Sequence, residues 1–147
     1  MKKLNVIIIG LIIIAAGCGT SRESALRESK PLFSIIYSES GGFTGQTVKW
    51  RLNSNGLVEK IETFPTGRDS VYESSVVDSS EIYGLRKKLD ESKFMDMNYD
   101  YAGNITYSII LMDGKTKSAT WGAREESSAP DNAKEIINQI RAYIKKN

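Results

Sequence analysis

The stretch NITYSIILMDGKTKSATW (residues 104–121) decides the fold. Apolar and polar residues alternate along both of its halves, which is the period-two pattern of strands with one buried face. The predicted inward positions are Ile105, Tyr107, Ile109, Leu111, Ala119 and Trp121. Asp113-Gly114 between the halves is a tight-turn pair. The stretch therefore predicts an antiparallel β-hairpin.

Strand patterns also occupy the preceding part of the chain. The inward positions are Phe33, Ile35 and Tyr37 in a first strand, and Val48, Trp50 and Leu52 in a second. NSNG (53–56) is a turn signal that leads into a third strand over 57–63. VYESSVV (71–77) predicts a fourth, shorter strand.

Two amphipathic helices are predicted. DSSE (78–81) forms a capping box, in which Asp78 accepts from first-turn amides and Glu81 reaches back. The helix that follows places Ile82, Leu85 and Leu89 on one face and ends near Lys93. Pro130 opens a last helix at its favoured first position. Its apolar stripe is Ala133, Ile136, Ile137, Ile140, Tyr143 and Ile144.

These elements predict an α+β domain over residues 32–147. Short turns join antiparallel strands, and each helix is apolar on one side only. We expect a single antiparallel sheet of about five strands with two helices packed on one face, in the order β-β-β-(β)-α-β-β-α.

MKKLNVIIIGLIIIAAGC (1–18) has the composition of a secretory signal: two lysines, an apolar run and small residues. AAGC resembles the bacterial lipobox, although Ala15 stands where Leu is preferred. The resemblance implies that residues 1–17 are a signal peptide and that Cys18 carries diacylglycerol. A lipoprotein of the bacterial cell envelope is therefore expected, anchored to a membrane that the sequence does not identify as inner or outer. The alternative is an ordinary signal peptide with a chance cysteine.

Residues 18–31 are predicted to combine the lipidated cysteine with a flexible tether reaching on the order of 20 Å. A short helix through Ala25 and Leu26 is the alternative. The chain has 20 Lys and Arg against 18 Asp and Glu, and removal of Lys2 and Lys3 leaves 18 of each. This balance does not indicate nucleic-acid binding, which needs a clustered basic face.

The sequence lacks several kinds of catalytic residue. It has no histidine, its one cysteine is assigned to lipid, and no Ser-x-x-Lys motif occurs. We therefore expect no enzyme and no cofactor, although paired carboxylates stay possible. DMNYD (96–100) resembles a calcium loop but has Tyr101 and Tyr107 at the positions that need Gly and Glu. We interpret it as a polar connection and expect no metal.

The segment between the first two strands holds more glycine than a turn requires. It reads Ser40, Gly41, Gly42, Phe43, Thr44, Gly45. This motif resembles the S-G-G-F-A-G of the emfourin family, small proteins that inhibit thermolysin-like metallopeptidases. The order of parts is also similar over about residues 33–145: ESKF (91–94), the Tyr107–Gly114 pattern, Trp121 and a Pro-started last helix. This chain differs from the family in its lipid signal and in extra sequence at roughly 62–77.

The resemblance implies a binding loop formed by residues 40–45, with a metallopeptidase active-site cleft as partner. Glycines allow close approach of the main chain, and Phe43 supplies an apolar anchor. The alternative is that Phe43 folds back over the sheet edge. REESSAPDN (124–132) is either a solvated loop, with Ser127 or Ser128 as N-cap, or a second contact loop. The alternative function is a structural or interaction lipoprotein of the envelope without inhibitory activity.

Overall fold

The computed structural model describes residues 18–43, 45–124 and 128–147, with side chains from residue 22 onward. The chain divides into two compact units between Lys30 and Pro31, one residue before the predicted boundary. In the first unit, Cys18–Glu28 forms helix α2. These residues are therefore helical, as in the alternative of a short helix through Ala25 and Leu26. An ion pair between Arg27 and Glu23, 3.0 Å apart and one turn away from each other, supports this helix.

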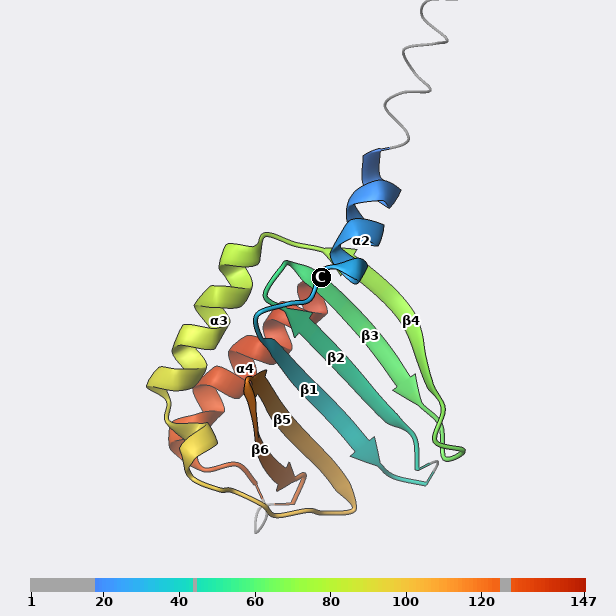
Figure 1. Ribbon diagram of the computed structural model, residues 1–147. Helices are drawn as coiled ribbons and strands as arrows, with labels where there is room; N and C mark the ends of the chain where they lie inside the picture. Colours follow the sequence, from blue (N-terminus) through green and yellow to red (C-terminus); the bar gives the residue numbers. More distant parts are fainter. Residues whose placement is uncertain (1–17, 44, 125–127) are drawn as a thin grey trace, which may run out of the picture. The chain divides into compact units, whose positions relative to one another are not determined.

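The second unit contains one sheet of six strands in the order β4-β3-β2-β1-β5-β6 (Figure 1). The strands are β1 (Ser34–Gly41), β2 (Thr47–Asn53), β3 (Leu57–Thr63), β4 (Asp69–Val76), β5 (Ile105–Asp113) and β6 (Lys115–Gly122). All neighbours pair antiparallel, so the predicted α+β class and single antiparallel sheet are confirmed. The predicted count of about five is wrong, because β4 is a full strand of eight residues.

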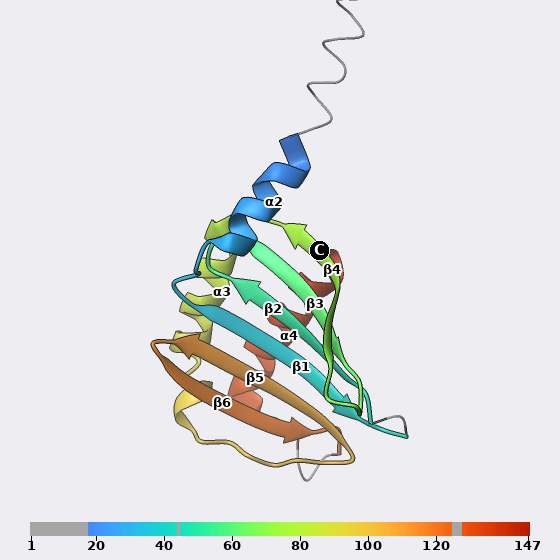
Figure 2. The ribbon, with the colours of Figure 1, turned by 45° about the vertical axis from the view of Figure 1, so that its right-hand side comes forward.

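Helices α3 (Ser79–Glu91) and α4 (Asp131–Lys146) pack on one face of this sheet (Figure 2). The described chain thus has three α-helices with α2, where two were expected, and a short 3₁₀ helix η1 at Phe94–Asp96. Asp78 caps α3 as predicted, since its carboxylate accepts from the Ser80 N–H at 2.9 Å.

Helix α3 ends at Glu91, near Lys93 as predicted, and the left-handed φ of +54° at Lys93 prevents its continuation. The predicted start of the last helix is corrected. Pro130 is the N-cap of α4 and not its first residue, since its ψ of 152° is extended. Ser128 therefore does not cap this helix, and Ser127 lies outside the described residues.

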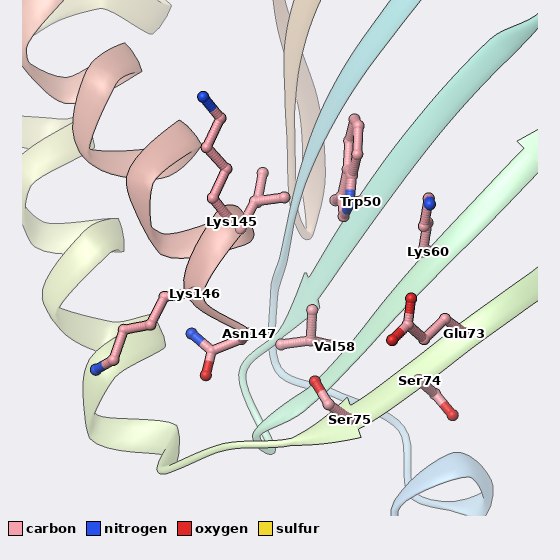
Figure 3. Close-up of a pocket in the computed structure, with 10 residues that line it drawn as sticks. Trp50, Val58, Lys60, Glu73, Ser74, Ser75, Lys145, Lys146 and Asn147 are labelled. Carbon is pink, nitrogen blue, oxygen red and sulfur yellow. The ribbon is translucent and has the colours of Figure 1, made fainter.

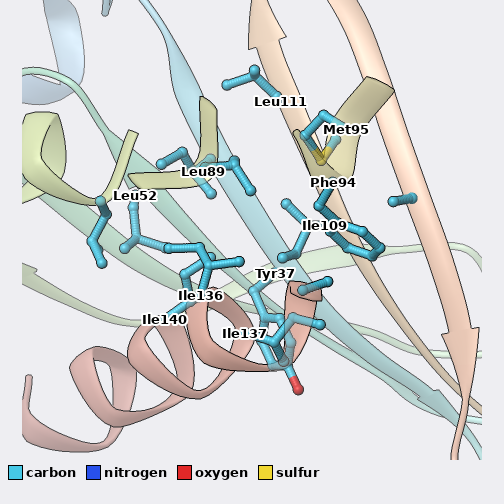
Figure 4. Close-up of a cluster of buried hydrophobic side chains, with 14 of the residues drawn as sticks. Tyr37, Leu52, Leu89, Phe94, Met95, Ile109, Leu111, Ile136, Ile137 and Ile140 are labelled. Atoms are coloured by element: carbon cyan, nitrogen blue, oxygen red, sulfur yellow. The ribbon is translucent and has the colours of Figure 1, made fainter. Parts of the chain in front are cut away.

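The core lies between the two helices and the helix-facing side of the sheet (Figure 4). Its fully buried large side chains are Tyr37, Phe94, Ile35, Leu52, Ile82, Leu89, Ile109 and Ile140. Trp121 closes the β6 side, with its ring 5.7 Å from Phe94 in an edge-on contact. Ile105 was predicted to face inward but is 42% exposed, because it is the first residue of β5 at the margin of the core.

The strand directions give the sheet two different ends. At one end, the Leu32 and Phe33 N–H groups donate to Ser54 Oγ at 2.8 and 3.3 Å, so the chain enters the domain beside the β2–β3 turn. The β1–β2 and β3–β4 loops, the start of β5 and the end of β6 all lie at the other end. Strand β1 connects the two ends over its eight residues, roughly 25 Å.

Two Ile→Ala changes in β5 test this core. Ile109→Ala removes a fully buried side chain and should lower the free energy of unfolding by about 2–5 kcal/mol. Ile105→Ala makes the same chemical change at the exposed strand start and should cost less than about 1 kcal/mol. Urea unfolding followed by circular dichroism measures both. Equal losses would contradict the assignment of Ile109 to the core centre.

Candidate functional site: the glycine loop

The glycine loop, residues 40–45, joins β1 to β2, and its base is held by the start of β5. The Gly42 N–H donates to the Asn104 carbonyl at 3.0 Å, and the Ser40 hydroxyl donates to the Thr106 carbonyl at 3.4 Å. A further backbone bond joins the Gly45 N–H to the Gly42 carbonyl at 3.4 Å. The loop is thus tied to the sheet on one side and closed by its own backbone.

All three glycines have a positive φ, but only one is sterically confined. Their φ angles are +104° at Gly41, +74° at Gly42 and +61° at Gly45. A Cβ on Gly41 would lie 2.1 Å from the Asn104 carbonyl oxygen, whereas one on Gly42 would meet no atom within 4 Å. Gly41 is therefore required by the packing of β1 against β5, and Gly42 by the turn conformation alone.

Phe43 at the tip of the loop is fully exposed. The alternative in which Phe43 folds back over the sheet edge is therefore not the observed arrangement. Thr44 lies outside the described residues. An exposed aromatic between two residues of left-handed backbone does not contribute to the core, so the loop presents one apolar group to a partner or to solvent.

Two other segments lie at the same end of the sheet. A Cβ on Gly45 would be 3.9 Å from the Pro65 ring. The β3–β4 loop, which also contains the half-exposed Phe64, therefore lies next to the glycine loop. The Ala123 N–H donates to the Ile105 carbonyl at 3.1 Å. The start of the REESSAPDN segment therefore lies beside the same strand that anchors the glycine loop, although residues 125–127 lie outside the described part. The role of residues 124–132 as a second contact loop stays a prediction.

A polar network behind the loop was not predicted from the sequence. The Tyr37 hydroxyl donates to Glu39 Oε1 at 2.8 Å and accepts from Arg141 Nε of α4 at 2.6 Å. Burial raises the pKa of Tyr37 well above its ordinary value, so this hydroxyl keeps its proton. One signal could have revealed the network: Arg141 continues the buried four-residue spacing of Ala133 and Ile137.

A hollow of about 440 Å³ lies at the opposite end of the sheet, between the last turn of α4 and strands β2 to β4 (Figure 3). Trp50 and Val58 form its apolar wall, and Lys60 lies over the Tyr72 ring, 5.0 Å from its centroid. Among the described residues that line it, Glu73 has the one carboxylic side chain.

The other predicted features occupy separate places. Cys18 is the first residue of α2, and its side chain lies outside the described part. Asp96, at the start of the DMNYD stretch, forms an ion pair with Lys117 at 2.5 Å. The backbone of Asp100 forms an isolated parallel β-bridge with Thr120 of β6. Within the described residues, no group of three His, Cys, Asp or Glu side chains could hold a metal ion. None of the described helices has the length and apolarity to cross a membrane.

Alanine at the two neighbouring glycines should give different losses of stability. Gly42→Ala should cost about 1–2 kcal/mol for the left-handed backbone. Gly41→Ala should add about 1–3 kcal/mol to this, because strand β5 must move away from the new Cβ. Thermal or urea unfolding of both variants measures the difference. Equal losses would contradict the close approach of Gly41 to Asn104.

Comparison with known proteins adds no family assignment: no protein-family model matches the chain, and the search of curated proteins finds no significant match.

Proposed function

We propose that this protein is a non-catalytic binding module that blocks the active-site cleft of a thermolysin-like metallopeptidase with its glycine loop. Lipid on Cys18 would anchor it in a bacterial cell envelope. The observation that supports the binding role best is the fully exposed Phe43 on a loop whose base is hydrogen-bonded to β5. The identity of the partner class rests on the resemblance of residues 40–45 to the emfourin motif.

The loop geometry suits insertion into a cleft. Glycines on both sides of Phe43 carry no side chains, so a partner's backbone can approach the loop closely. Full burial of a phenylalanine side chain contributes about 1.5–3 kcal/mol. Because the loop base is already fixed by backbone hydrogen bonds, less conformational entropy is lost on binding.

The position of the loop also suits an anchored inhibitor. The chain enters the domain at the β2–β3 end of the sheet, and the glycine loop lies at the far end of β1. The loop therefore lies at the end of the sheet opposite to the point where the chain enters the domain. A partner could bind the loop without contact with the residues at that entry point.

Phe43→Ala tests the binding role. We expect the unaltered chain to inhibit a thermolysin-like metallopeptidase stoichiometrically and Phe43→Ala to weaken inhibition on the order of 10- to 100-fold. The free energy of unfolding should stay the same, because the side chain is exposed. Peptide-hydrolysis assays with increasing inhibitor concentration measure the first quantity, and circular dichroism during urea unfolding measures the second.

Tyr72→Ala is the matched control, because Tyr72 is also an exposed aromatic but lies on β4. It should inhibit as well as the unaltered chain. Absence of inhibition by the unaltered chain against several such peptidases would reject the inhibitor proposal. The structural or interaction lipoprotein would then be the better description, and capture with the Phe43 and Phe43→Ala forms would identify its envelope partner.

Cys18→Ser tests the anchor. Cells fed a radiolabelled fatty acid should label the unaltered protein and retain it in the membrane fraction, because two or more acyl chains anchor stably. Cys18→Ser should abolish the label, since no second cysteine is present. Equal labelling of both forms would contradict the assignment of Cys18.

A further inference from the structure

Arg141 of α4 is held in a fixed orientation by aromatic groups at the loop end of the sheet. Its Nε–H donates to the Tyr37 hydroxyl at 2.6 Å. Its guanidinium lies 4.6 Å from the centroid of the Tyr107 ring and 5.6 Å from that of Tyr37. A planar cation packed against two rings and bonded through one nitrogen cannot rotate freely, so the direction of its other donors is set.

Most of the hydrogen-bonding capacity of Arg141 is unused among the described residues. A guanidinium has five N–H donors, and the bond to Tyr37 uses one of them. The Glu39 carboxylate reaches Arg141 through the Tyr37 hydroxyl and forms no direct ion pair with it in the described part. Burial disfavours the charge of Arg141, but the oxygens of Tyr37, Tyr107 and Glu39 outweigh this effect and raise its pKa. The group is therefore a half-buried permanent cation with donors to spare.

A hollow of about 300 Å³ adjoins this cation. Tyr107 and Trp121 form its aromatic wall, with their rings stacked 5.9 Å apart, and Ser128 and Ala129 border its rim. The described residues of its lining include no aspartate or glutamate. Lys134, the second cation of the lining, already forms an ion pair with Asp131 at 2.6 Å. Among the described residues, the hollow thus presents a guanidinium that forms no direct ion pair, beside an aromatic surface.

The hollow and the glycine loop lie at the same end of the sheet, one strand row apart. Glu39, Tyr107 and Trp121 form one cross-strand row on the helix-facing side of the sheet. The next row along β1 pairs Ser40, the first residue of the loop, with Thr106. A partner large enough to bury Phe43 therefore lies within reach of the hollow.

We propose that the Arg141 hollow is a second contact site, which binds the carboxylate of an aspartate or glutamate side chain on the protein that the glycine loop engages. A carboxylate is planar and accepts two parallel N–H bonds from a guanidinium. A phosphate group is a poorer fit, because it is usually recognised by a cluster of arginines and this lining has one. The proposal rests on the proposed function for the identity of the partner, but the chemistry of the site can be tested without that partner.

The first experiment titrates the full ¹⁵N-labelled chain with sodium acetate at constant ionic strength. We expect saturable shifts of the Arg141 Nε–H and Trp121 indole N–H resonances, which sodium chloride does not produce. Lys145→Ala removes a cation from the exposed end of the same helix and should leave the Trp121 response unchanged. Arg141→Lys keeps the charge but loses the planar fork and should weaken the Trp121 response at least tenfold. Absence of a saturable shift, or an equal response to inorganic phosphate, would overturn the proposal.

The second experiment measures inhibition of the metallopeptidase by the same full chain and its variants. Arg141→Lys should weaken inhibition at least tenfold, and Lys145→Ala should not change it. Tyr37→Phe keeps Arg141 but removes the acceptor of its Nε–H, so it should weaken inhibition less than Arg141→Lys does. This variant tests the same site with Arg141 present, in case the Arg141 variant does not fold. Inhibition unaffected by Arg141→Lys would overturn the second contact. Failure of the unaltered chain to inhibit would reject the proposed function, whereas the acetate titration would still decide whether the hollow binds carboxylates.

Discussion

The pairing of β1 with β2 on one side and β5 on the other is the constraint on which the domain depends. This register places Tyr37 opposite both Trp50 and Ile109, and so directs Ile35 and Tyr37 toward the two helices. Because side chains alternate along a strand, a slip of one residue would turn both of them to the other face. The same register sets Gly41 opposite Ile105, which fixes where the glycine loop begins. Core and candidate site are thus consequences of one set of strand pairings.

The loop end of the molecule combines a rigid base with an exposed tip. Asn104 leaves no room for a side chain at Gly41, while Gly42 faces open space. Behind this base, the Tyr37 hydroxyl connects β1 to Arg141 of α4. This part-buried hydrogen bond between β1 and α4 restricts movement of the strand that leads into the loop, whereas the Phe43 side chain is fully exposed. A surface with a base fixed in this way loses less conformational entropy when it binds another molecule.

The two edge strands of the sheet, β6 and β4, differ in how their outer sides are protected from pairing with other chains. Along β6, the Thr120 N–H donates to the Tyr99 carbonyl at 2.8 Å and the Tyr101 N–H donates to the Thr120 carbonyl at 3.0 Å, so a neighbouring segment covers part of this edge. Strand β4 has an irregular register opposite Lys60 and Ile61. Such a bulge increases the local twist, and edge strands commonly use it to avoid pairing with other chains.

Local patterns determined much of this protein from the sequence alone. Period-two alternation identified the strands and the hairpin of β5 and β6, and Asp78 marked the start of α3, because strand faces and helix caps depend on residues that are close in sequence. The glycine motif also predicted residues 40–45 as the candidate site, and this stays a prediction. The full length of β4, the outward position of Phe43 and the contact between Arg141 and Tyr37, 104 residues apart, were decided only by the tertiary structure. These features depend on which distant segments pack together, and side-chain identity at one position does not specify its neighbours across the fold.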